Sequence, residues 1–318
     1  MLHGAEALEP PVDPVIAQVQ EALTAAGHET SSISVGNTIE PLITSLRSAA
    51  PDLVFNLTES FREKSALDSN LAALLNLLQL RYTGSSPSGL VLAGDKSLTK
   101  KLLSFHEIRT PQFATIYRGA ADHVGDLRFP LIVKPPQEDA SIGITEKSVV
   151  RDVSELLNKM DELQAAYQSA ILVEEFIAGR EFYVGVLGNQ NARALPVIEL
   201  DFRDHATNNP LRIASFDVKW SEERDHETAS IFPEDVPEEL STRMQTIAVE
   251  AFHSLRLRDY ARIDLRVNEA GEVFVIEVNP NCYLEKQSEF ARAADRAGIP
   301  YEQLIPQIVE LAAARYSR

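Results

Sequence analysis

Tyr260-Ala-Arg-Ile-Asp-Leu-Arg-Val-Asn-Glu-Ala-Gly-Glu-Val-Phe-Val-Ile-Glu-Val-Asn279 is the stretch of sequence that decides the fold. It consists of two runs in which apolar and polar residues alternate, separated by Asn268-Glu-Ala-Gly271. Alternation with a period of two is typical of a half-buried strand, and a short loop containing Asn and Gly is typical of a hairpin. The stretch therefore predicts two antiparallel strands joined by a tight turn.

The polar side chains of this hairpin are predicted to share one face. With a loop of either two or four residues, Arg262 lies opposite Glu277 and Asp264 lies opposite Val275. Because successive side chains of a strand point to opposite faces, Arg262 and Asp264 then share a face with Glu277 and Asn279. The other face is predicted to pack on a core and carries Ile263, Leu265, Phe274, Ile276 and Val278.

Two carboxylates and an amide oxygen on one face make a set of oxygen ligands. Such ligands suit hard cations such as Mg²⁺, which usually shares its shell with substrate phosphates. The set Asp264, Glu277 and Asn279 therefore predicts a nucleotide beside the hairpin. A surface ladder in which Arg262 pairs with Glu277 is the alternative. The position of Glu277 inside Val273-Phe-Val-Ile-Glu-Val278 favours the metal site, because burial of an isolated charge is costly.

Composition limits the classes of partner. The chain has 318 residues with 47 acidic and 30 basic side chains, a net charge of −17, which disfavours binding to nucleic acids. Any bound phosphate must therefore meet a local group of Lys or Arg. The single cysteine, Cys282, excludes an intramolecular disulfide and fits a reducing compartment. No apolar run approaches a membrane span, and Met1-Leu-His-Gly4 does not resemble a signal peptide. These features predict a cytoplasmic protein without a membrane or nucleic-acid partner.

Periodicity divides the chain into three parts, with boundaries near residues 93 and 178. Strands alternate with helices over about the first 90 residues, which predicts a doubly wound parallel sheet whose opening strand, Leu2-His3, is short and at an edge. Helices are predicted at 12–26, 66–80, 96–106, 153–166, 237–255 and 301–316. Besides the hairpin, strands are predicted at 52–56, 82–84, 112–116, 131–134, 171–174, 181–187 and 194–200.

Two lysines at element ends could neutralise the phosphates of the expected nucleotide. Lys96 begins a helix, and Lys134 ends an apolar strand before a loop. A lone lysine is more often a solvated surface residue, so the order of motifs matters more than either residue. That order is Asp95-Lys96, Leu131-Ile-Val-Lys-Pro135, Val173-Glu-Glu-Phe-Ile177, Glu181-Phe-Tyr-Val184, Arg262-Ile-Asp264 and Ile276-Glu-Val-Asn279.

This order of motifs resembles the ATP-grasp superfamily, and within it the chain looks most like the D-alanine–D-alanine ligases. The resemblance covers nearly all of the chain. It implies a three-domain α/β and α+β architecture, with an N-terminal domain at 1–93 and two ATP-grasp subdomains at 94–178 and 179–318 that sandwich ATP. It also implies two Mg²⁺ or Mn²⁺ ions, and ATP-dependent joining of a carboxylate to an amine through an acyl phosphate. Family members are commonly homodimers, which the residues themselves do not settle.

By resemblance, several residues take roles around the triphosphate and the sugar. Lys96 and Lys134 match the lysines of the α- and β-phosphates, and Lys219 matches the γ-phosphate lysine of a mobile loop. Ser141 lies in the stretch that matches the phosphate loop, where the first of the family's two serines is missing. Glu181 matches the glutamate that binds the ribose hydroxyls.

The resemblance also assigns the adenine strand and the catalytic hairpin. Glu174, Glu175 and Ile177 match the strand that meets the adenine, and Glu175 stands where the D-alanine ligases often have a lysine. Arg262 is similar to the arginine that stabilises the oxyanion of the tetrahedral intermediate. The magnesium ligands of the family match the set that the hairpin already grouped, Asp264, Glu277 and Asn279.

The departures from the family concern the amino-acid substrates. The His-Gly motif of the first D-alanine site is replaced around Glu59, and no clear counterpart of an N-terminal glutamate is found in Leu8-Glu-Pro-Pro-Val12. Tyr283 replaces a glycine beside the second substrate, whereas Ser288 falls at the carboxylate-binding serine. Three hypotheses remain: D-alanine ligation, ligation of another amino acid or small acid, and a nucleotide-binding module without ligase activity.

Overall fold

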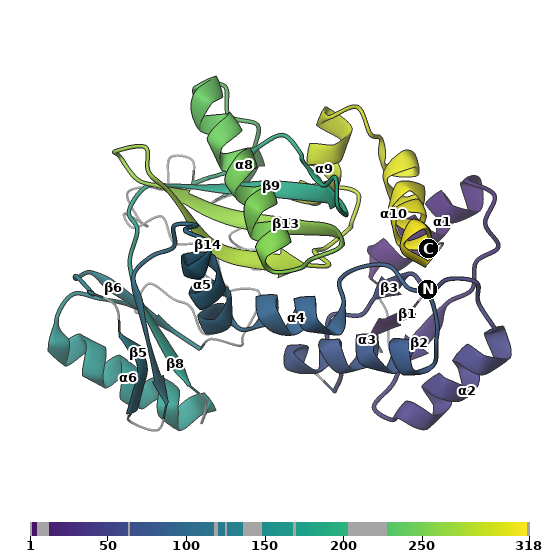
Figure 1. Cartoon of the computed structure of the whole chain (residues 1–318), viewed down its shortest axis with the longest axis horizontal. Coiled ribbons are helices and arrows are strands. Elements are labelled where there is room, and N and C mark those ends of the chain that lie inside the picture. Colours follow the sequence, from purple (N-terminus) through teal and green to yellow (C-terminus); the bar gives the residue numbers. More distant parts are fainter. Residues whose placement is uncertain are drawn as a thin grey trace.

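The computed structural model describes residues 2–4, 13–62, 64–117, 120–124, 126–135, 148–167, 170–202 and 228–316. These residues form three separate sheets with helices around them (Figure 1). The predicted residues Ser141 and Lys219 lie outside the described part of the chain. No helix within the described ranges is both long enough and apolar enough to cross a membrane.

The first sheet is parallel and has the strand order β2-β1-β3. The sequence predicted that the short opening strand lies at an edge of this sheet. That prediction is wrong, because β1 is the central strand. The predicted strand at 52–56 is largely replaced by a single bridge between Val54 and Tyr82. The elements are β1 Leu2–Gly4, α1 Pro14–Ala25, β2 Ile33–Val35, α2 Ile39–Ala49, β3 Asn56–Leu57, a 3-10 turn Ser65–Leu67 and α3 Asp68–Leu77.

Two helices lead from this sheet to the second one. They are α4 Pro87–Gly94 and α5 Lys96–Phe105, which Figure 1 shows between the sheets. The second sheet is antiparallel in the order β5-β4-β8-β6-β7, and α6 packs on its apolar face. Its elements are β4 Phe113–Tyr117, β5 Ala120–Val124, β6 Leu131–Lys134, β7 Val149–Val150, α6 Val153–Tyr167 and β8 Ile171–Glu175.

The third sheet contains the predicted hairpin and has the order β12-β11-β9-β13-β14, with β10 paired to β9. Helix α8 packs on one face, together with α5. Helices α1, α9 and α10 cover one end of the other face. The elements are β9 Arg180–Gly188, β10 Arg193–Ala194, β11 Ile198–Asp201, β12 Ala229–Ile231, α8 Glu238–Ser254, β13 Asp259–Val267, β14 Val273–Pro280, α9 Glu289–Arg296 and α10 Tyr301–Tyr316.

The hairpin forms as predicted, but its register is different. Arg262 lies opposite Asn279, and Asp264 lies opposite Glu277. The loop contains three residues: Asn268 and Glu272 are joined by a backbone hydrogen bond of 3.1 Å. Gly271 has a φ of 75°, which suits the left-handed position of a three-residue hairpin loop.

A bulge completes this change of register. The three-residue loop shifts the pairing by one residue, and the irregularity between Asp264 and Leu265 shifts it by one more. Two shifts of one residue restore the original alternation of faces. The prediction that Arg262, Asp264, Glu277 and Asn279 share a face is therefore confirmed.

The apolar face of β14 is partly different from the prediction. Val273, Val275 and Val278 are buried in the core beneath α8, whereas Phe274 and Ile276 are only half-buried. Phe274 pairs with Arg266 across the strands, and the guanidinium of Arg109 lies over its ring. The bulge explains this difference, because it changes which residues of β14 face the core.

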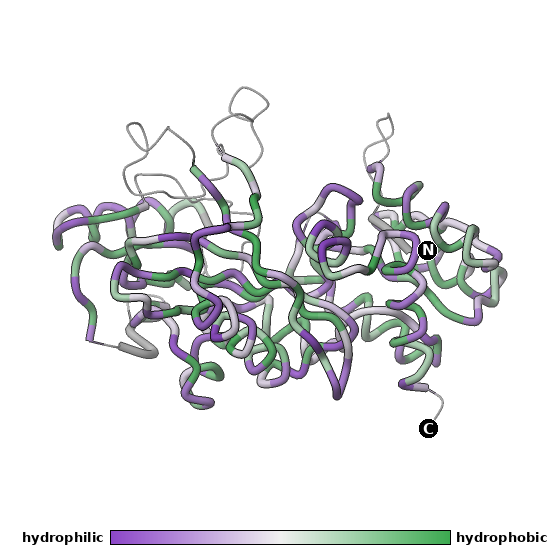
Figure 2. The backbone as a smooth tube through the Cα atoms, turned by 90° about the horizontal axis from the view of Figure 1, so that it is seen from above, coloured by the Kyte–Doolittle hydropathy of each residue, from purple (hydrophilic) through white to green (hydrophobic). Residues whose placement is uncertain are grey.

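Each sheet is drawn from one of the three sequence regions divided near residues 93 and 178, and the boundaries themselves stay predictions. The packing nevertheless crosses them. Helix α1 shares a core with α9 and α10, and α5 shares one with α8. Seen from above, hydrophobic and hydrophilic segments alternate along the chain in all parts of the molecule (Figure 2). The sites described below lie where these regions meet.

Candidate functional site

Helix α5 connects the second and third sheets through two lysines. Asp95 caps the helix by accepting hydrogen bonds from the backbone of its first turn. Lys96 and Lys100 are four residues apart and so lie on one helical face. Lys96 Nζ is 2.8 Å from Glu277 Oε1 on β14, and Lys100 Nζ is 3.1 Å from Glu174 Oε1 on β8. The face of α5 is therefore tied to both sheets by ion pairs.

Glu174 is the centre of a buried group of charges. Its carboxylate is 2 % exposed and meets Lys134 at 2.9 Å as well as Lys100. Burial opposes ionisation of Glu174, but the two lysines outweigh it and lower its pKa. Burial lowers the pKa of Lys100 to about 8, although Glu174 opposes this shift. Sequence reasoning missed Lys100, for which the spacing of four residues from Lys96 was the available signal.

Arg262 is held on the open face of the third sheet. Its Nε and Nη2 donate to Asp264 Oδ1 and Oδ2 at 2.8 and 2.9 Å. Nη1 is 3.4 Å from Glu289 Oε2 on α9, and the guanidinium lies 4.6 Å from the Tyr183 ring centroid. Burial opposes the charge, but Asp264 raises the pKa of Arg262 well above its usual range. The alternative ladder between Arg262 and Glu277 is therefore wrong, because these two residues have other partners.

The next positions of the same face form a second ion pair. Arg266 Nη2 donates to Glu181 Oε2 at 3.1 Å, across the register of β13 and β9. Glu181 Oε1 accepts a hydrogen bond from the Tyr183 hydroxyl at 3.1 Å. Arg266 Nη1 donates to the Ile177 carbonyl at 3.0 Å. Arg266, which the sequence reasoning also missed, thus joins the predicted ribose residue to the predicted adenine strand.

The predicted metal ligands have the right donors for a hard cation. Asp264 and Glu277 are directly opposite each other, and Asn279 is two residues further along β14. Asn279 Nδ2 is buried and has no hydrogen-bond partner among the described residues, so this amide is not fully engaged within the protein. No group of three or more His, Cys, Asp or Glu suited to a metal occurs in the described ranges. Two carboxylates and an amide fit Mg²⁺ when other ligands come from phosphates.

Two predicted residues lie apart from this face. Glu175 Oε1 accepts a hydrogen bond from the backbone nitrogen of Arg128 at 3.0 Å. Ser288 is the N-cap of α9, and its hydroxyl accepts from Ala291 N at 3.5 Å. Its position fixes the start of the helix that carries Glu289, the second partner of Arg262.

A cavity of about 180 Å³ is lined by Tyr260 of β13 and by residues of the loop after β14. Tyr260, which points to the same face of β13 as Arg262, forms part of its wall. The charge of Arg262 also acts on Cys282 in the wall, although burial is the main effect and raises the pKa of that thiol. The cavity is lined by Asp13, Val15, Ile16, Asn56, Leu57, Thr58, Glu59, Ser60, Tyr260, Asn281, Cys282, Tyr283 and Leu284.

This cavity contains two of the three residues predicted to bind substrate, Glu59 and Tyr283. The Tyr283 hydroxyl donates to Asp13 Oδ1 at 2.7 Å, while the same oxygen caps α1. Burial raises the pKa of Tyr283, and the carboxylates of Asp13 and Glu59 add to this shift. Asp13 was not predicted, because its only local signal is that of a helix cap. Ser288 does not line the cavity.

Comparisons with known proteins agree with this geometry. The family described as "D-ala D-ala ligase C-terminus" matches residues 102–310. The chain is 34 % identical over 312 residues to the uncharacterized protein y4sG of Sinorhizobium fredii, covering 96 % of this chain and 88 % of that protein. It is 32 % identical over 298 residues to a D-alanine–D-alanine ligase of Syntrophotalea carbinolica, covering 93 % and 90 %.

The fold is similar to that of solved ligases. The crystal structure of D-alanine–D-alanine ligase from Bacillus anthracis complexed with ATP gives a TM-score of 0.72 at 24 % identity. The match covers 98 % of this chain and 96 % of that one. A ligase from Coxiella burnetii gives a TM-score of 0.69 at 19 % identity, covering 99 % and 94 %. The predicted three-part ATP-grasp fold is confirmed by these likenesses.

Proposed function

Because the chain belongs to the D-alanine–D-alanine ligase family, we propose that it is an ATP-dependent carboxylate–amine ligase. It would join two amino acids, or an amino acid and a small acid, through an acyl phosphate. The observation that carries this proposal is the shared face of Arg262, Asp264, Glu277 and Asn279. The 2.8 Å ion pair between Lys96 and Glu277 brings the predicted phosphate lysine to that face.

The lysines have the positions needed to receive a triphosphate between the two sheets. Lys96 and Lys134 are each within 2.9 Å of a carboxylate, so arrival of phosphate would exchange one anionic partner for another. Such fixed positive charges stabilise charge that spreads onto phosphoryl oxygens during transfer. Lys219 and Ser141 are proposed to complete this set at the γ-phosphate.

Asp264, Glu277 and Asn279 are the residues that would hold a divalent cation. When bound, such a cation polarises phosphoryl oxygens and neutralises their charge. We propose two Mg²⁺ ions, with Mn²⁺ as the substitute. With a nucleotide bound, Lys96 would pair with phosphate, and Glu277 would be available as a ligand of the cation.

Arg262 is proposed to stabilise the oxyanion that forms when the amine attacks. Its pKa lies well above the usual range, so the side chain stays charged at any pH at which the amine is nucleophilic. Asp264 and Glu289 fix its orientation from two sides, which keeps the donors in place before the reaction.

The cavity lined by Tyr260 and Tyr283 is the proposed amino-acid site. Asp13 and Glu59 give its wall two carboxylates, which favour the ammonium group of an amino acid. Tyr283 narrows it and is fixed by Asp13. D-alanine, the amino acid in the names of the relatives, is the first candidate substrate. Amino acids with a second amine are the next candidates, because two carboxylates in the wall favour two ammonium groups.

A screen of carboxylate and amine pairs tests the proposal. Phosphate release from ATP with Mg²⁺ is measured for each pair, and the product is identified by its mass. We expect at least one pair to give both phosphate and a condensed product, and Arg262→Ala to lose both while still binding ATP. Binding of ATP without phosphate release for any pair would instead favour the nucleotide-binding module.

Three further proposals concern the protein in the cell. The number of metal ions, a cytoplasmic location and a homodimer stay predictions. Metal titration of phosphate release, cell fractionation and sedimentation of the purified protein measure them in turn.

A further inference from the structure

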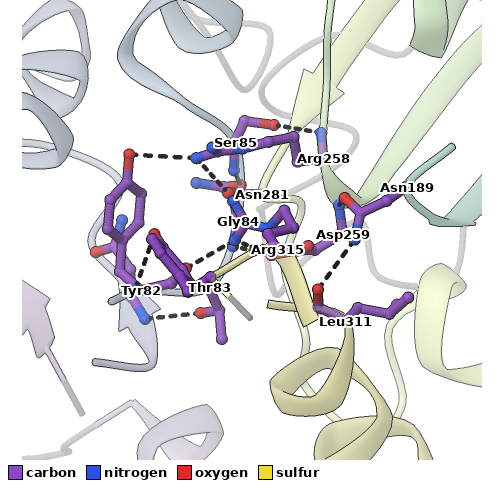
Figure 3. Close-up of polar contacts among 12 residues, drawn as sticks. Tyr82, Thr83, Gly84, Ser85, Asn189, Arg258, Asp259, Asn281, Leu311 and Arg315 are labelled. Carbon is purple, nitrogen blue, oxygen red and sulfur yellow. Dashed lines mark hydrogen bonds and ion pairs between the residues drawn. The ribbon is translucent and has the colours of Figure 1, made fainter. Parts of the chain in front are cut away.

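A polar cluster lies where the first sheet, the third sheet and the last helix meet (Figure 3). We call it the junction cluster, and its members are Tyr82, Thr83, Gly84, Ser85, Asn189, Arg258, Asp259, Asn281, Leu311 and Arg315. Asp259 is at its centre and is fully buried. One carboxylate oxygen, Asp259 Oδ2, accepts from Gly84 N at 2.7 Å and from Arg315 Nη2 at 2.8 Å. A single side chain at the start of β13 therefore binds both the segment before α4 and the end of α10.

Arg315 completes the link between α10 and the N-terminal region. Its Nη2 also donates to the Tyr82 carbonyl at 2.8 Å. Arg258, the residue before β13, approaches the same segment, and its Nη2 donates to the Tyr82 hydroxyl at 3.2 Å and to the Gly84 carbonyl at 3.3 Å. Residues 82–84 are thus held by two arginines from different elements.

Asn189, the residue after β9, connects the start of β13 to helix α10 through hydrogen bonds. Its Oδ1 accepts from Asp259 N at 3.2 Å, and its Nδ2 donates to the Leu311 carbonyl of α10 at 3.1 Å. Asp259 has a φ of 64°, a conformation that non-glycine residues adopt only where the surroundings impose it. The backbone at this position is therefore fixed by its partners and not by local preference.

The cluster reaches the proposed amino-acid cavity along two routes. On one side, Ser85 N donates to Asn281 Oδ1 at 2.8 Å, and Asn281 lines the cavity. On the other side, Asn56 N donates to Thr83 Oγ1 at 3.0 Å. Asn56 Oδ1 in turn accepts from the Thr58 hydroxyl at 2.6 Å, and both of these residues also line the cavity, on a segment other than that of Asn281.

Gly84 lies directly against the side chain of Asn281. A β-carbon added to Gly84 would lie 2.4 Å from Asn281 Oδ1, and the φ of Gly84 is 89°. The segment 82–85 and the loop after β14 are therefore in direct contact, so a shift of one wall of the cavity relative to the other must disturb this contact.

From this arrangement we infer that Asp259 and Arg315 are positioning residues for the amino-acid substrate. They hold the two walls of the cavity at a fixed spacing without lining it. The inference rests on the proposed function, which makes this cavity the amino-acid site. The lysines and hairpin residues proposed for ATP have their own ion pairs, so loss of the junction should weaken amino-acid binding and leave ATP binding nearly unchanged.

The test compares Arg315→Ala with a matched control, Arg296→Ala. Arg296 is an exposed arginine of α9 whose guanidinium lies over the Phe232 ring, so its loss removes the same charge from a nearby helix without touching the cluster. Phosphate release is measured with varied amino acid at saturating ATP, and with varied ATP at saturating amino acid. The amino acid is D-alanine, or that of the most active pair if different.

We expect Arg315→Ala to raise the KM for the amino acid at least tenfold, since small misplacements of bound groups cost up to about 10²-fold, with the KM for ATP changed less than threefold. Arg296→Ala should match the wild type in both. An unchanged amino-acid KM in folded Arg315→Ala, or equal changes in both KM values, would overturn the inference.

A second variant guards against loss of folding. Asp259→Asn combined with Arg315→Gln removes both buried charges but keeps amide groups in their places. We expect this protein to fold and to show the same selective rise in amino-acid KM, smaller than that of Arg315→Ala. A normal KM in this double variant would also count against the positioning role.

A binding measurement separates this inference from the proposed function. Calorimetric titration of amino acid into protein that holds a non-hydrolysable ATP analogue needs no turnover. If wild-type protein binds amino acid but forms no product, ligase activity fails, and the inference is still judged by whether Arg315→Ala weakens that binding at least tenfold. If the wild type binds no amino acid, the assignment of the cavity and the inference fall together, whereas ATP binding survives.

Discussion

Replacement of Lys100 by methionine should change how the stability of the protein depends on pH. The pKa of Lys100 is lowered from 10.5 to about 8 by burial, so the unfolded chain binds more protons than the folded one between these values. The free energy of unfolding therefore rises with pH in this window. For one group with these two pKa values, the rise from near pH 7 to near pH 9.5 is about 2 kcal/mol. Methionine has a similar shape and no charge, so the variant lacks this contribution.

Urea unfolding at both pH values measures the effect. The difference in unfolding free energy between the wild type and Lys100→Met isolates Lys100, because other titrating groups act in both proteins. Lys101→Met is the control, since it changes the next residue of α5, which is only half-buried. We expect the difference to shift with pH by about 2 kcal/mol for Lys100→Met and by much less for the control. A shift of the opposite sign, or no shift, would refute the argument that burial beside Glu174 lowers the pKa of Lys100.

Three other substitutions test separate parts of the site. Arg262→Ala should lower kcat for product formation by about 10²–10³-fold with a nearly unchanged Kd for ATP, and a kcat close to that of the wild type would remove Arg262 from the reaction. Glu277→Gln should raise the Mg²⁺ concentration needed for half-maximal phosphate release by more than tenfold, because a charged ligand is lost; an unchanged Mg²⁺ titration would exclude Glu277 as a ligand. Gly84→Ala should destabilise the protein by about 1–3 kcal/mol in urea unfolding, and equal stability would show that the segment 82–85 can move away from Asn281.

Alternation alone predicts which polar residues of the hairpin share a face within each strand. Arg262 and Asp264 are two residues apart, as are Glu277 and Asn279, so each pair must share a face of its strand. Which residues stand opposite each other depends on the loop and on bulges. The composition of Asn268-Glu-Ala-Gly271 did not distinguish a loop of three residues from a loop of two or four. No local sequence pattern marked the bulge after Asp264. The face within each strand was therefore predictable. The register was not, and the two strands share their polar face because the two one-residue shifts cancel.

The partners of the charged residues were beyond the reach of local patterns. Glu174 was assigned to the adenine by resemblance, but its buried position between Lys100 and Lys134 comes from packing of α5 against the second sheet. Arg266 follows the alternation of the hairpin, yet nothing in the sequence indicated Glu181 on β9 as its partner. Such pairs depend on tertiary contacts between elements far apart in the chain.

The ion pairs of the proposed nucleotide site are compatible with so acidic a chain. With a net charge of −17, a field that attracts phosphate cannot come from the whole surface and must be local. Lys96 and Lys134 are buried, and each is held by a carboxylate, because an unpaired buried ammonium group would be costly. In the proposed site, a phosphate bound by Lys96 would replace Glu277 as its partner, and Glu277 would then be one of the residues that could hold a divalent cation. The Lys96–Glu277 contact would thus link the proposed nucleotide and metal sites, and it follows from burial and charge balance in residues that lie almost two hundred positions apart.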